Sequence, residues 1–324
     1  MQKTILGASK LEVSALAMGS DVLGSKIDQK STFALLDFYH SQGGNFIDTG
    51  NFYASWLPNC KGGESETVIG AWMKARGNRE RLVISSKLGF DYPGCAGGLT
   101  AAEIERECEK SLRRLQTDRL DLYYAHRDDR QVAQEESMEA FDRLVKAGKV
   151  RFLGASNLAV WRIAEANRTA KVNGWSPYSV VQQRFTYLRP RHGADFGPQI
   201  CLGDELRDFA SAEGIGLVAY SVLLQGAYTR VERELPAQFA GPDSDARLEA
   251  LNHVAKEVER SPNQVVIAWM RQSTPSILPI IAGSRIEQLQ ENILALDLTL
   301  TSDQMMHLDN VGNPVIKQAW LQPS

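Results

Sequence analysis

The sequence predicts an α/β fold, a (β/α)8 TIM barrel in which eight strands and the helices between them close into one ring. Short apolar segments alternate along the chain with longer segments of helical period. No Pro-, Gly- or Ser-rich linker divides the 324 residues, so we expect residues 1–324 to form a single domain. An open doubly wound sheet would give a similar alternation. However, no GxGxxG follows an early strand, and GCAGGL near Gly94 has the wrong spacing, which favours the barrel.

Each predicted strand is a short apolar run that leads into a polar loop. The eight runs are residues 15–19, 45–48, 82–86, 120–125, 151–155, 179–182, 216–219 and 278–281. Between them, apolar residues recur at helical spacing, as in Ile104, Cys108, Leu112 and Leu115; Met138, Phe141, Leu144 and Val145; and Leu248, Leu251, Val254 and Val258. Two connections, 188–204 and 225–246, are too long for simple turns, and long loops on barrels usually cover a site.

Composition restricts the possible partners. Lys plus Arg number 36 against 39 for Asp plus Glu, a net charge of -3, which gives no electrostatic reason to expect nucleic acid or an anionic membrane. The most apolar runs are far shorter than the ~20 residues of a membrane span, and no export signal is evident, so we expect a cytoplasmic protein that binds a small molecule. The sequence does not indicate an oligomeric state. The cysteines have no metal-like spacing, so we expect reduced thiols and no metal site; they are Cys60, Cys95, Cys108 and Cys201.

Four polar residues stand at the ends of three consecutive predicted strands. NFIDTGNFY contains Asp48 and Tyr53, SSKLG contains Lys87, and YYAHRDD contains His126. Taken singly, such residues are usually caps, packing residues or solvated groups. Because the carboxyl ends of barrel strands meet at one face, their joint occurrence on successive strands indicates a catalytic site.

The four side chains suit the reduction of a carbonyl group. A hydride must reach the carbonyl carbon, and an acid must protonate the oxygen. Tyr53 can be that acid only if its pKa, normally ~10, is lowered, and an ammonium about 4 Å away stabilises a phenolate by a few kcal/mol. We therefore expect Lys87 to lower the pKa of Tyr53, Asp48 to position Lys87, and His126 to orient the carbonyl.

These residues make the chain resemble the aldo-keto reductase superfamily over nearly its whole length. TILGASKLEVSALAMG resembles the amino-terminal β-hairpin and first strand of that family, and Asp48, Tyr53, Lys87 and His126 match its catalytic tetrad. The resemblance implies that Tyr53 is the general acid. It also implies that NADPH lies across the barrel mouth without a Rossmann motif.

Further motifs resemble the family's cofactor-binding segments. GASN implies that Ser156 and Asn157 contact the nicotinamide carboxamide together with Gln182, and VAYSVLLQG implies that Tyr220 stacks on the nicotinamide ring. The same segment implies contacts with the pyrophosphate by Ser221, Leu223 and Gly226. IAGSRIEQLQEN implies contacts of the adenosine with Gln288, Glu291 and Asn292, and of its 2′-phosphate with Ser284 and Arg285. A Ser and an Arg at a helix start suit a phosphate, which favours NADP over NAD.

The segment after Tyr53, ASWLPNCKGG, departs from many relatives. We expect its Trp56 and Leu57 to form one wall of the substrate pocket, and Arg127 to lie at the rim within reach of a polar substrate. The sequence therefore predicts an NADP-dependent reductase of aldehydes or ketones, with a polar or sugar-like substrate favoured over a steroid. The alternative is a regulatory protein that binds the cofactor, as do the potassium-channel beta subunits that resemble this family.

Overall fold

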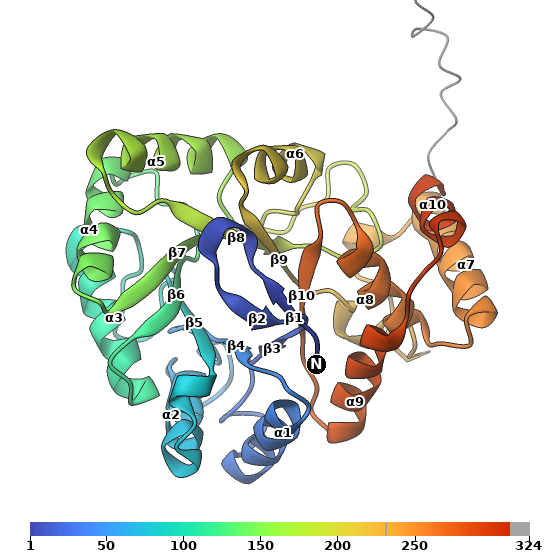
Figure 1. Cartoon of the computed structure of the whole chain (residues 1–324), viewed down its shortest axis with the longest axis horizontal. Helices are drawn as coiled ribbons and strands as arrows, with labels where there is room; N and C mark the ends of the chain where they lie inside the picture. The colour runs from blue at the N-terminus through green and yellow to red at the C-terminus, as the bar shows by residue number, and fades with distance from the viewer. Residues whose placement is uncertain (231, 312–324) are drawn as a thin grey trace, which may run out of the picture.

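Eight parallel strands close into a barrel in the computed structural model of the chain, which describes residues 1–230 and 232–311 (Figure 1). The ring runs in the order β10-β3-β4-β5-β6-β7-β8-β9, and β10 pairs with β3, so the predicted barrel is confirmed and an open sheet is excluded. The strands are β3 (Ala17–Gly19), β4 (Phe46–Asp48), β5 (Val83–Leu88), β6 (Leu120–Ala125), β7 (Val150–Ser156), β8 (Tyr178–Arg184), β9 (Gly216–Tyr220) and β10 (Ile277–Ile281).

Strand β5 runs two residues beyond its predicted end. Lys87 pairs with Tyr124 and Leu88 with Ala125 of β6, so the backbone stays extended through the polar Ser86 and Lys87. The apolar pattern placed the end of this strand too early, because Lys87 is polar and yet fully buried at the barrel mouth. Its side chain therefore points into the barrel from a fixed strand position.

Helices surround the barrel (Figure 1), and each contributes buried side chains to the hydrophobic core. In α3, for example, the predicted apolar positions Ile104, Cys108, Leu112 and Leu115 are all buried. The helices are α1 (Gln29–Ser41), α2 (Glu64–Arg76), α3 (Ala101–Leu115), α4 (Gln134–Lys146), α5 (Val160–Asn173), α6 (Asp204–Glu213), α7 (Pro242–Glu257), α8 (Pro262–Gln272), α9 (Ile286–Leu294) and α10 (Ser302–Asn310).

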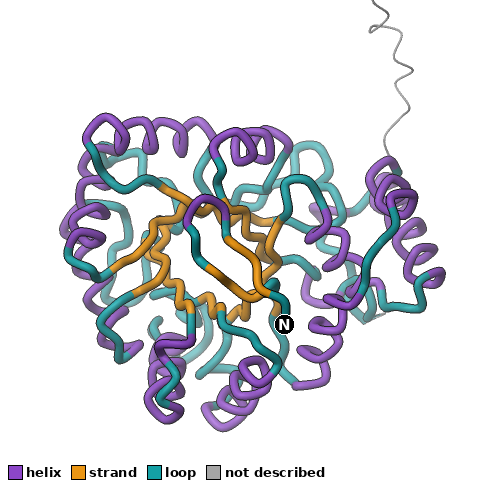
Figure 2. Tube along the Cα trace, in the orientation of Figure 1, coloured by secondary structure: helices purple, strands orange, loops and turns teal. Residues whose placement is uncertain are grey.

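An amino-terminal hairpin covers one end of the barrel, as Figure 2 shows. Strands β1 (Lys3–Ile5) and β2 (Glu12–Ser14) pair antiparallel, which confirms the predicted hairpin. Leu6, Leu11 and Val13 of the hairpin region pack in one cluster with inward-facing side chains such as Phe46 and Leu122. The hairpin therefore seals the amino-terminal end, and a cavity is available at the end where the strands have their carboxyl termini.

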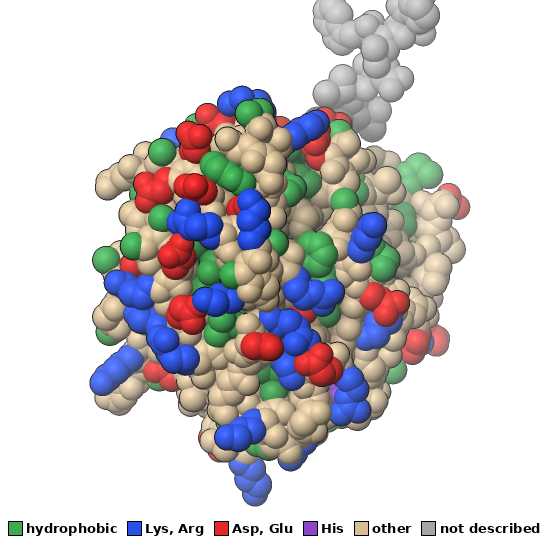
Figure 3. Space-filling view, turned by 60° about the vertical axis from the view of Figure 1, so that its left-hand side comes forward, with side chains coloured by type: hydrophobic (Ala, Val, Ile, Leu, Met, Phe, Trp, Pro, Cys, Tyr) green, Lys and Arg blue, Asp and Glu red, His purple; other side chains and the backbone are tan. Residues whose placement is uncertain are grey.

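Charged side chains of both signs mingle on the surface, as on the face shown in Figure 3. Ion pairs join neighbouring helices, such as Arg143 of α4 with Glu105 of α3. In the described part of the chain, no helix has the length and apolar character needed to cross a membrane. All four cysteines are free thiols.

Candidate active site

The four predicted catalytic residues meet at the carboxyl end of the barrel. Asp48 is the last residue of β4, Lys87 lies one residue before the end of β5, and His126 directly follows β6. Because β4, β5 and β6 are consecutive neighbours in the ring, these positions share one rim. Tyr53 reaches the same place from the turn that follows β4, where its backbone N–H donates to Gly50 O.

Lys87 is the centre of the cluster. Its Nζ donates to Asp48 Oδ2 at 2.6 Å, to the carbonyl of Thr49 at 2.7 Å and to the hydroxyl of Tyr53 at 2.8 Å. An ammonium has three N–H donors and no acceptor, so all three are used and the Tyr53 oxygen must accept. The hydroxyl hydrogen of Tyr53 is left with Asp48 Oδ2, at a long 3.5 Å, or with a group in the cavity. The geometry thus leaves this proton available for transfer.

Asp48 is held by groups from two sides of the barrel. Its Oδ1 accepts from Ser85 Oγ at 2.7 Å and from Gln182 Nε2 at 2.9 Å, while Oδ2 accepts from Lys87. Gln182 comes from β8, across the mouth from β4. Contact of Gln182 with the nicotinamide carboxamide stays a prediction; in this structure its amide N–H donates to Asp48. Its carbonyl oxygen is the part of the side chain left for other contacts.

Burial sets the electrostatics of the cluster. Desolvation lowers the pKa of Lys87 below its usual value, with Asp48 acting in the opposite direction. Desolvation, followed by the charge of Asp48, raises the pKa of Tyr53 well above its usual value. A pKa of Tyr53 below its usual value was expected from Lys87; in this structure desolvation and the charge of Asp48 outweigh any such effect of the lysine. Tyr53 therefore keeps its proton at neutral pH, as a proton donor must.

His126 is almost fully buried at 7 % exposure beside the cluster. Desolvation, with a smaller effect from the charge of Lys87, lowers its pKa well below the usual value, so the imidazole is neutral at physiological pH. Its Nδ1 has no hydrogen-bond partner among the described residues. The ring lies edge-on to Phe52 and Phe90, at centroid distances of 5.2 and 4.9 Å. A neutral ring held by two aromatic neighbours suits a group that orients a ligand without adding charge.

A cavity of about 910 Å³ opens over the cluster and extends across the mouth. Asp48, Tyr53 and His126 line it at one side. Most of the predicted cofactor residues line it as well, namely Asn157, Gln182, Tyr220, Ser221, Leu223, Gly226, Ser284, Gln288, Glu291 and Asn292. Cofactor-sized ligands fit pockets of this volume.

Two predicted cofactor residues are not part of the cavity wall. Ser156 is fully buried behind Asn157, whose Nδ2 donates to its hydroxyl at 3.1 Å. Arg285 is the N-cap residue of α9 and is exposed. Asn157 itself is fixed by Tyr220, whose hydroxyl donates to Asn157 Oδ1 at 2.7 Å. Asn157 and Tyr220 thus form one rigid unit on the wall.

The sequence analysis missed two cavity residues that carry positive charge. Arg230 and Arg233 line the cavity from the loop between β9 and α7, and within the described residues neither forms an ion pair with an acid. Both arginines lie in the long connection 225–246, which was expected to cover a site, and this position could have identified them as cavity residues. Unpaired arginines in a cavity suit an anionic group of a ligand.

Aromatic rings form the wall next to Tyr53. Phe52 contacts Trp56 at 5.3 Å and Phe90 at 4.8 Å between ring centroids, and all three line the cavity. Trp56 is 50 % exposed, so one face of its indole is available. Leu57 is not among the lining residues, and Arg127 lies behind Phe90, 5.4 Å from its ring centre.

A buried group of possible metal ligands lies away from this cavity. Cys95, Glu103 and Glu107 bring their ligand atoms within 4.8 Å of one another, a grouping not expected from the cysteine spacing. Each is already engaged: Cys95 Sγ donates to Glu103 at 2.9 Å, Arg106 pairs with Glu103 at 2.5 Å, and Lys110 pairs with Glu107 at 2.7 Å. The charges of the two carboxylates are therefore balanced by cationic side chains.

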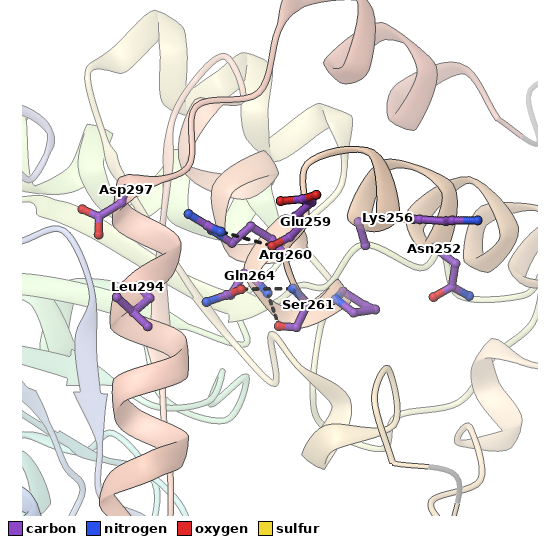
Figure 4. Close-up of a pocket in the computed structure, with 10 residues that line it drawn as sticks. Asn252, Lys256, Glu259, Arg260, Ser261, Gln264, Leu294 and Asp297 are labelled. Carbon is purple, nitrogen blue, oxygen red and sulfur yellow. Dashed lines mark hydrogen bonds between the residues drawn. The ribbon is translucent and has the colours of Figure 1, made fainter.

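A second hollow of about 720 Å³ lies among the ends of α7 and α9 and the start of α8 (Figure 4). Its lining mixes Lys256 and Arg260 with Glu259 and Asp297. We assign it no chemistry, because the opposite charges balance one another and no residue of the catalytic cluster reaches it.

The barrel and the cluster at its mouth define a TIM-barrel enzyme, with its chemistry at the carboxyl ends of the strands. Within that class the chain belongs to the aldo/keto reductase family, a family of oxidoreductases that use nicotinamide cofactors. The sequence model of the Aldo/keto reductase family matches residues 15–313. The resemblance drawn from the tetrad and the loop motifs is thus confirmed.

Relatives of known or inferred activity align with nearly the whole chain. The chain is 33% identical to aldo-keto reductase ausK of Aspergillus calidoustus, over 94% of this chain and 79% of that protein. It is 30% identical to norsolorinic acid reductase A of Aspergillus parasiticus, over 93% of this chain and 78% of that protein. It is also 30% identical to aryl-alcohol dehydrogenase [NADP(+)] of Phanerodontia chrysosporium, over 93% of this chain and 83% of that protein.

Proposed function

We propose that this protein is an NADP-dependent reductase that converts an aldehyde or ketone, preferably an aromatic one, to the alcohol. The observation that carries the proposal is the position of Lys87 Nζ, 2.6 Å from Asp48 Oδ2 and 2.8 Å from the Tyr53 hydroxyl, at the base of a large cavity. This arrangement supports proton transfer from Tyr53, because the phenolate that results stays beside a buried ammonium.

When bound beside the cluster, NADPH would supply the hydride for the carbonyl carbon. Tyr53 gives its hydroxyl proton to the carbonyl oxygen, so the carbonyl group gains a hydride and a proton and becomes an alcohol. The phenolate accepts a hydrogen bond from Lys87, and Asp48 balances the lysine charge. His126, a neutral imidazole that lines the cavity, orients the carbonyl oxygen by a hydrogen bond.

The residues around the cavity fit a dinucleotide phosphate. Arg230 and Arg233 offer unpaired positive charge for phosphates, and Ser284 at the start of α9 faces the same cavity. Tyr220, held by Asn157, offers a ring face for the nicotinamide. The NADP(+) in the name of one relative supports the choice of NADP over NAD.

The aromatic wall favours an aryl substrate over a sugar-like one. Phe52, Trp56 and Phe90 next to Tyr53 offer ring faces for stacking and few hydrogen-bonding groups for hydroxyls. Two relatives are named for an aryl alcohol and for norsolorinic acid, which supports this revision of the substrate expected from the sequence.

The test is NADPH consumption over a panel of aryl aldehydes, aryl ketones and oxidised sugars, with Tyr53→Phe as the variant. We expect turnover of aryl carbonyls and a loss of roughly 100- to 10,000-fold in kcat for Tyr53→Phe, the range for a general acid. The variant keeps the ring, so its NADPH affinity, measured by fluorescence titration, should stay near that of the parent.

Three outcomes would each contradict part of the proposal. An unchanged rate in Tyr53→Phe would remove the assignment of the acid. NADPH binding without turnover of any carbonyl on the panel would instead support the regulatory alternative. Faster turnover of oxidised sugars than of aryl carbonyls would reverse the substrate preference.

A further inference from the structure

The loop after β3 brings into the main cavity an acid that the proposed mechanism does not use. Asp21 lines this cavity together with Tyr53 and His126, and it is an exposed residue. Desolvation nevertheless raises the pKa of its carboxyl group above the usual value. A carboxyl group that is accessible and yet desolvated lies in a concave site, because protein surrounds it on most sides. The accessible surface of Asp21 is therefore surface of the cavity.

Neighbouring contacts fix the backbone of Asp21 beside the catalytic cluster. Gly19 of β3 pairs with Asp48 of β4. The next residue, Ser20, donates from its Oγ to the carbonyl of Asp48 at 2.8 Å, and its own carbonyl accepts from Ser65 Oγ at 2.7 Å. Asp21 follows these contacts directly, so its place relative to the catalytic carboxylate is set by the strand pairing.

The charge of Asp21 is available to a ligand. In the part of the chain that the structure describes, no side chain forms an ion pair with it, and the charges of Lys26 and Lys87 act on it from a greater distance. The backbone N–H groups of Asp21 and Val22 donate to the carboxylate, which has about four acceptor sites, so sites remain for a ligand. Its charge adds to the desolvation that raises the pKa of Tyr53, which places it close to the proposed acid.

We infer that Asp21 is a specificity residue that favours aryl carbonyl substrates with a hydroxyl or amino donor and rejects those with a carboxylate. The inference rests on the proposed function and names the substrate class of that same site. Phe52 and Trp56 follow β4, the neighbour of β3 in the ring, so an aryl group stacked on them can present a substituent to Asp21 (Figure 1). A carboxylate accepts a hydrogen bond from such a donor, whereas it repels a second carboxylate.

The experiment measures kcat/KM with NADPH for benzaldehyde and for its meta- and para-substituted hydroxy, methoxy and carboxy derivatives. In the parent protein, the better hydroxybenzaldehyde should exceed the matching methoxybenzaldehyde by about tenfold, because a methoxy group has no donor for the carboxylate. Benzaldehyde should exceed both carboxybenzaldehydes by about tenfold or more, because like charges repel. These quantities are ratios within one protein, so they do not depend on the fraction of it that is folded.

Two variants separate the charge of Asp21 from its role as an acceptor. Asp21→Asn removes the charge and keeps the shape, so carboxybenzaldehyde should come within about threefold of benzaldehyde. Asp21→Ala also removes the acceptor, so the hydroxy and methoxy derivatives should come within about threefold of each other. Asp91→Asn is the matched control and should behave as the parent. Asp91 follows β5 at the same rim, its side chain is 74 % exposed, and it does not line the cavity.

The outcomes distinguish this inference from the proposed function. Parent ratios near one, or ratios that stay the same in both Asp21 variants, would overturn the inference while benzaldehyde is still reduced. Binding of NADPH by Asp21→Asn more than about threefold tighter than by the parent, with unchanged ratios, would overturn it by showing that Asp21 faces the cofactor phosphates. No turnover of benzaldehyde or any derivative by the parent would contradict the proposed function itself, and the inference with it.

Discussion

The side chain of Lys87 decides the chemistry that this site can perform. With its three donors directed to Asp48, Thr49 and Tyr53, the ammonium fixes the phenol in one orientation and leaves the phenolic hydrogen as the mobile proton. The raised pKa of Tyr53 means that the residue holds this proton until a partner takes it. Acidity must then come from the reaction itself, as negative charge develops on the carbonyl oxygen.

We predict that Trp56, which lines the cavity next to Tyr53, contributes to substrate selection. We expect Trp56→Ala to raise KM for aryl carbonyls about three- to tenfold, because an aromatic contact is worth about 0.5 to 1.5 kcal/mol. NADPH affinity should stay within about twofold, a change below ~0.5 kcal/mol. Steady-state kinetics and fluorescence titration measure the two quantities.

Trp161→Ala is the control for this prediction. Trp161 is 55 % exposed on α5 and does not line the cavity, so its loss removes an indole without touching the site. Were Trp56→Ala mainly to unfold the protein while the ranking of substrates stayed the same, Trp56 would be a packing residue.

His126 makes the stability of the fold depend on pH. Its folded-state pKa lies well below 6.5, whereas an unfolded histidine titrates near ~6.5, so below that pH the unfolded chain binds the extra proton. The stabilisation is complete above pH ~6.5 and is lost as the pH falls toward the folded pKa.

Urea unfolding of the parent and of His126→Gln measures this pH dependence. The free energy of unfolding of the parent, relative to the variant, should fall by about 1 kcal/mol from pH 7.5 to 5.5. Parallel pH profiles would show that His126 is accessible to protons in the fold.

At the scale of elements, two segments are candidates for binding the phosphates of the proposed cofactor. The loop between β9 and α7 brings Arg230 and Arg233 into the cavity, whereas the start of α9 brings Ser284 in and leaves Arg285 exposed outside the lining. The sequence indicated the second segment, because a Ser-Arg pair at a helix start is a familiar phosphate site. The structure indicates the loop between β9 and α7 as a further candidate.

Alanine substitutions of Arg230 and of Arg285 test which of the two segments binds the phosphates. We expect Arg230→Ala to weaken NADPH by about 1.5 to 3 kcal/mol, the scale of a charge-assisted hydrogen bond, and Arg285→Ala to have the smaller effect. Comparison with NADH tells which phosphate is involved: a loss for NADPH alone indicates the 2′-phosphate, and equal losses indicate the pyrophosphate. Full NADPH affinity in Arg230→Ala, with a large loss in Arg285→Ala, would restore the assignment made from sequence.

At the scale of the whole molecule, closure of the barrel is what assembles the site. Asp48 from β4 accepts hydrogen bonds from β5 and from Gln182 of β8, so the carboxylate is fixed only when strands on opposite sides of the mouth are in place. The hairpin at the other end excludes water from the barrel interior with Leu6, Leu11 and Val13. The organisation of residues 1–324 as one domain, and a cytoplasmic location, stay predictions.

The sequence by itself determined the fold class and the four residues of the cluster. Apolar runs alternating with helical periods are local signals, and polar residues at strand ends are visible because strand position is fixed by burial. Tertiary structure decided the rest: the extension of β5 through Lys87, the upward pKa shift of Tyr53, the aromatic wall, and the places of Arg230 and Arg233. Each of these depends on which side chains from distant segments share a buried volume, and desolvation and packing act through space rather than along the chain.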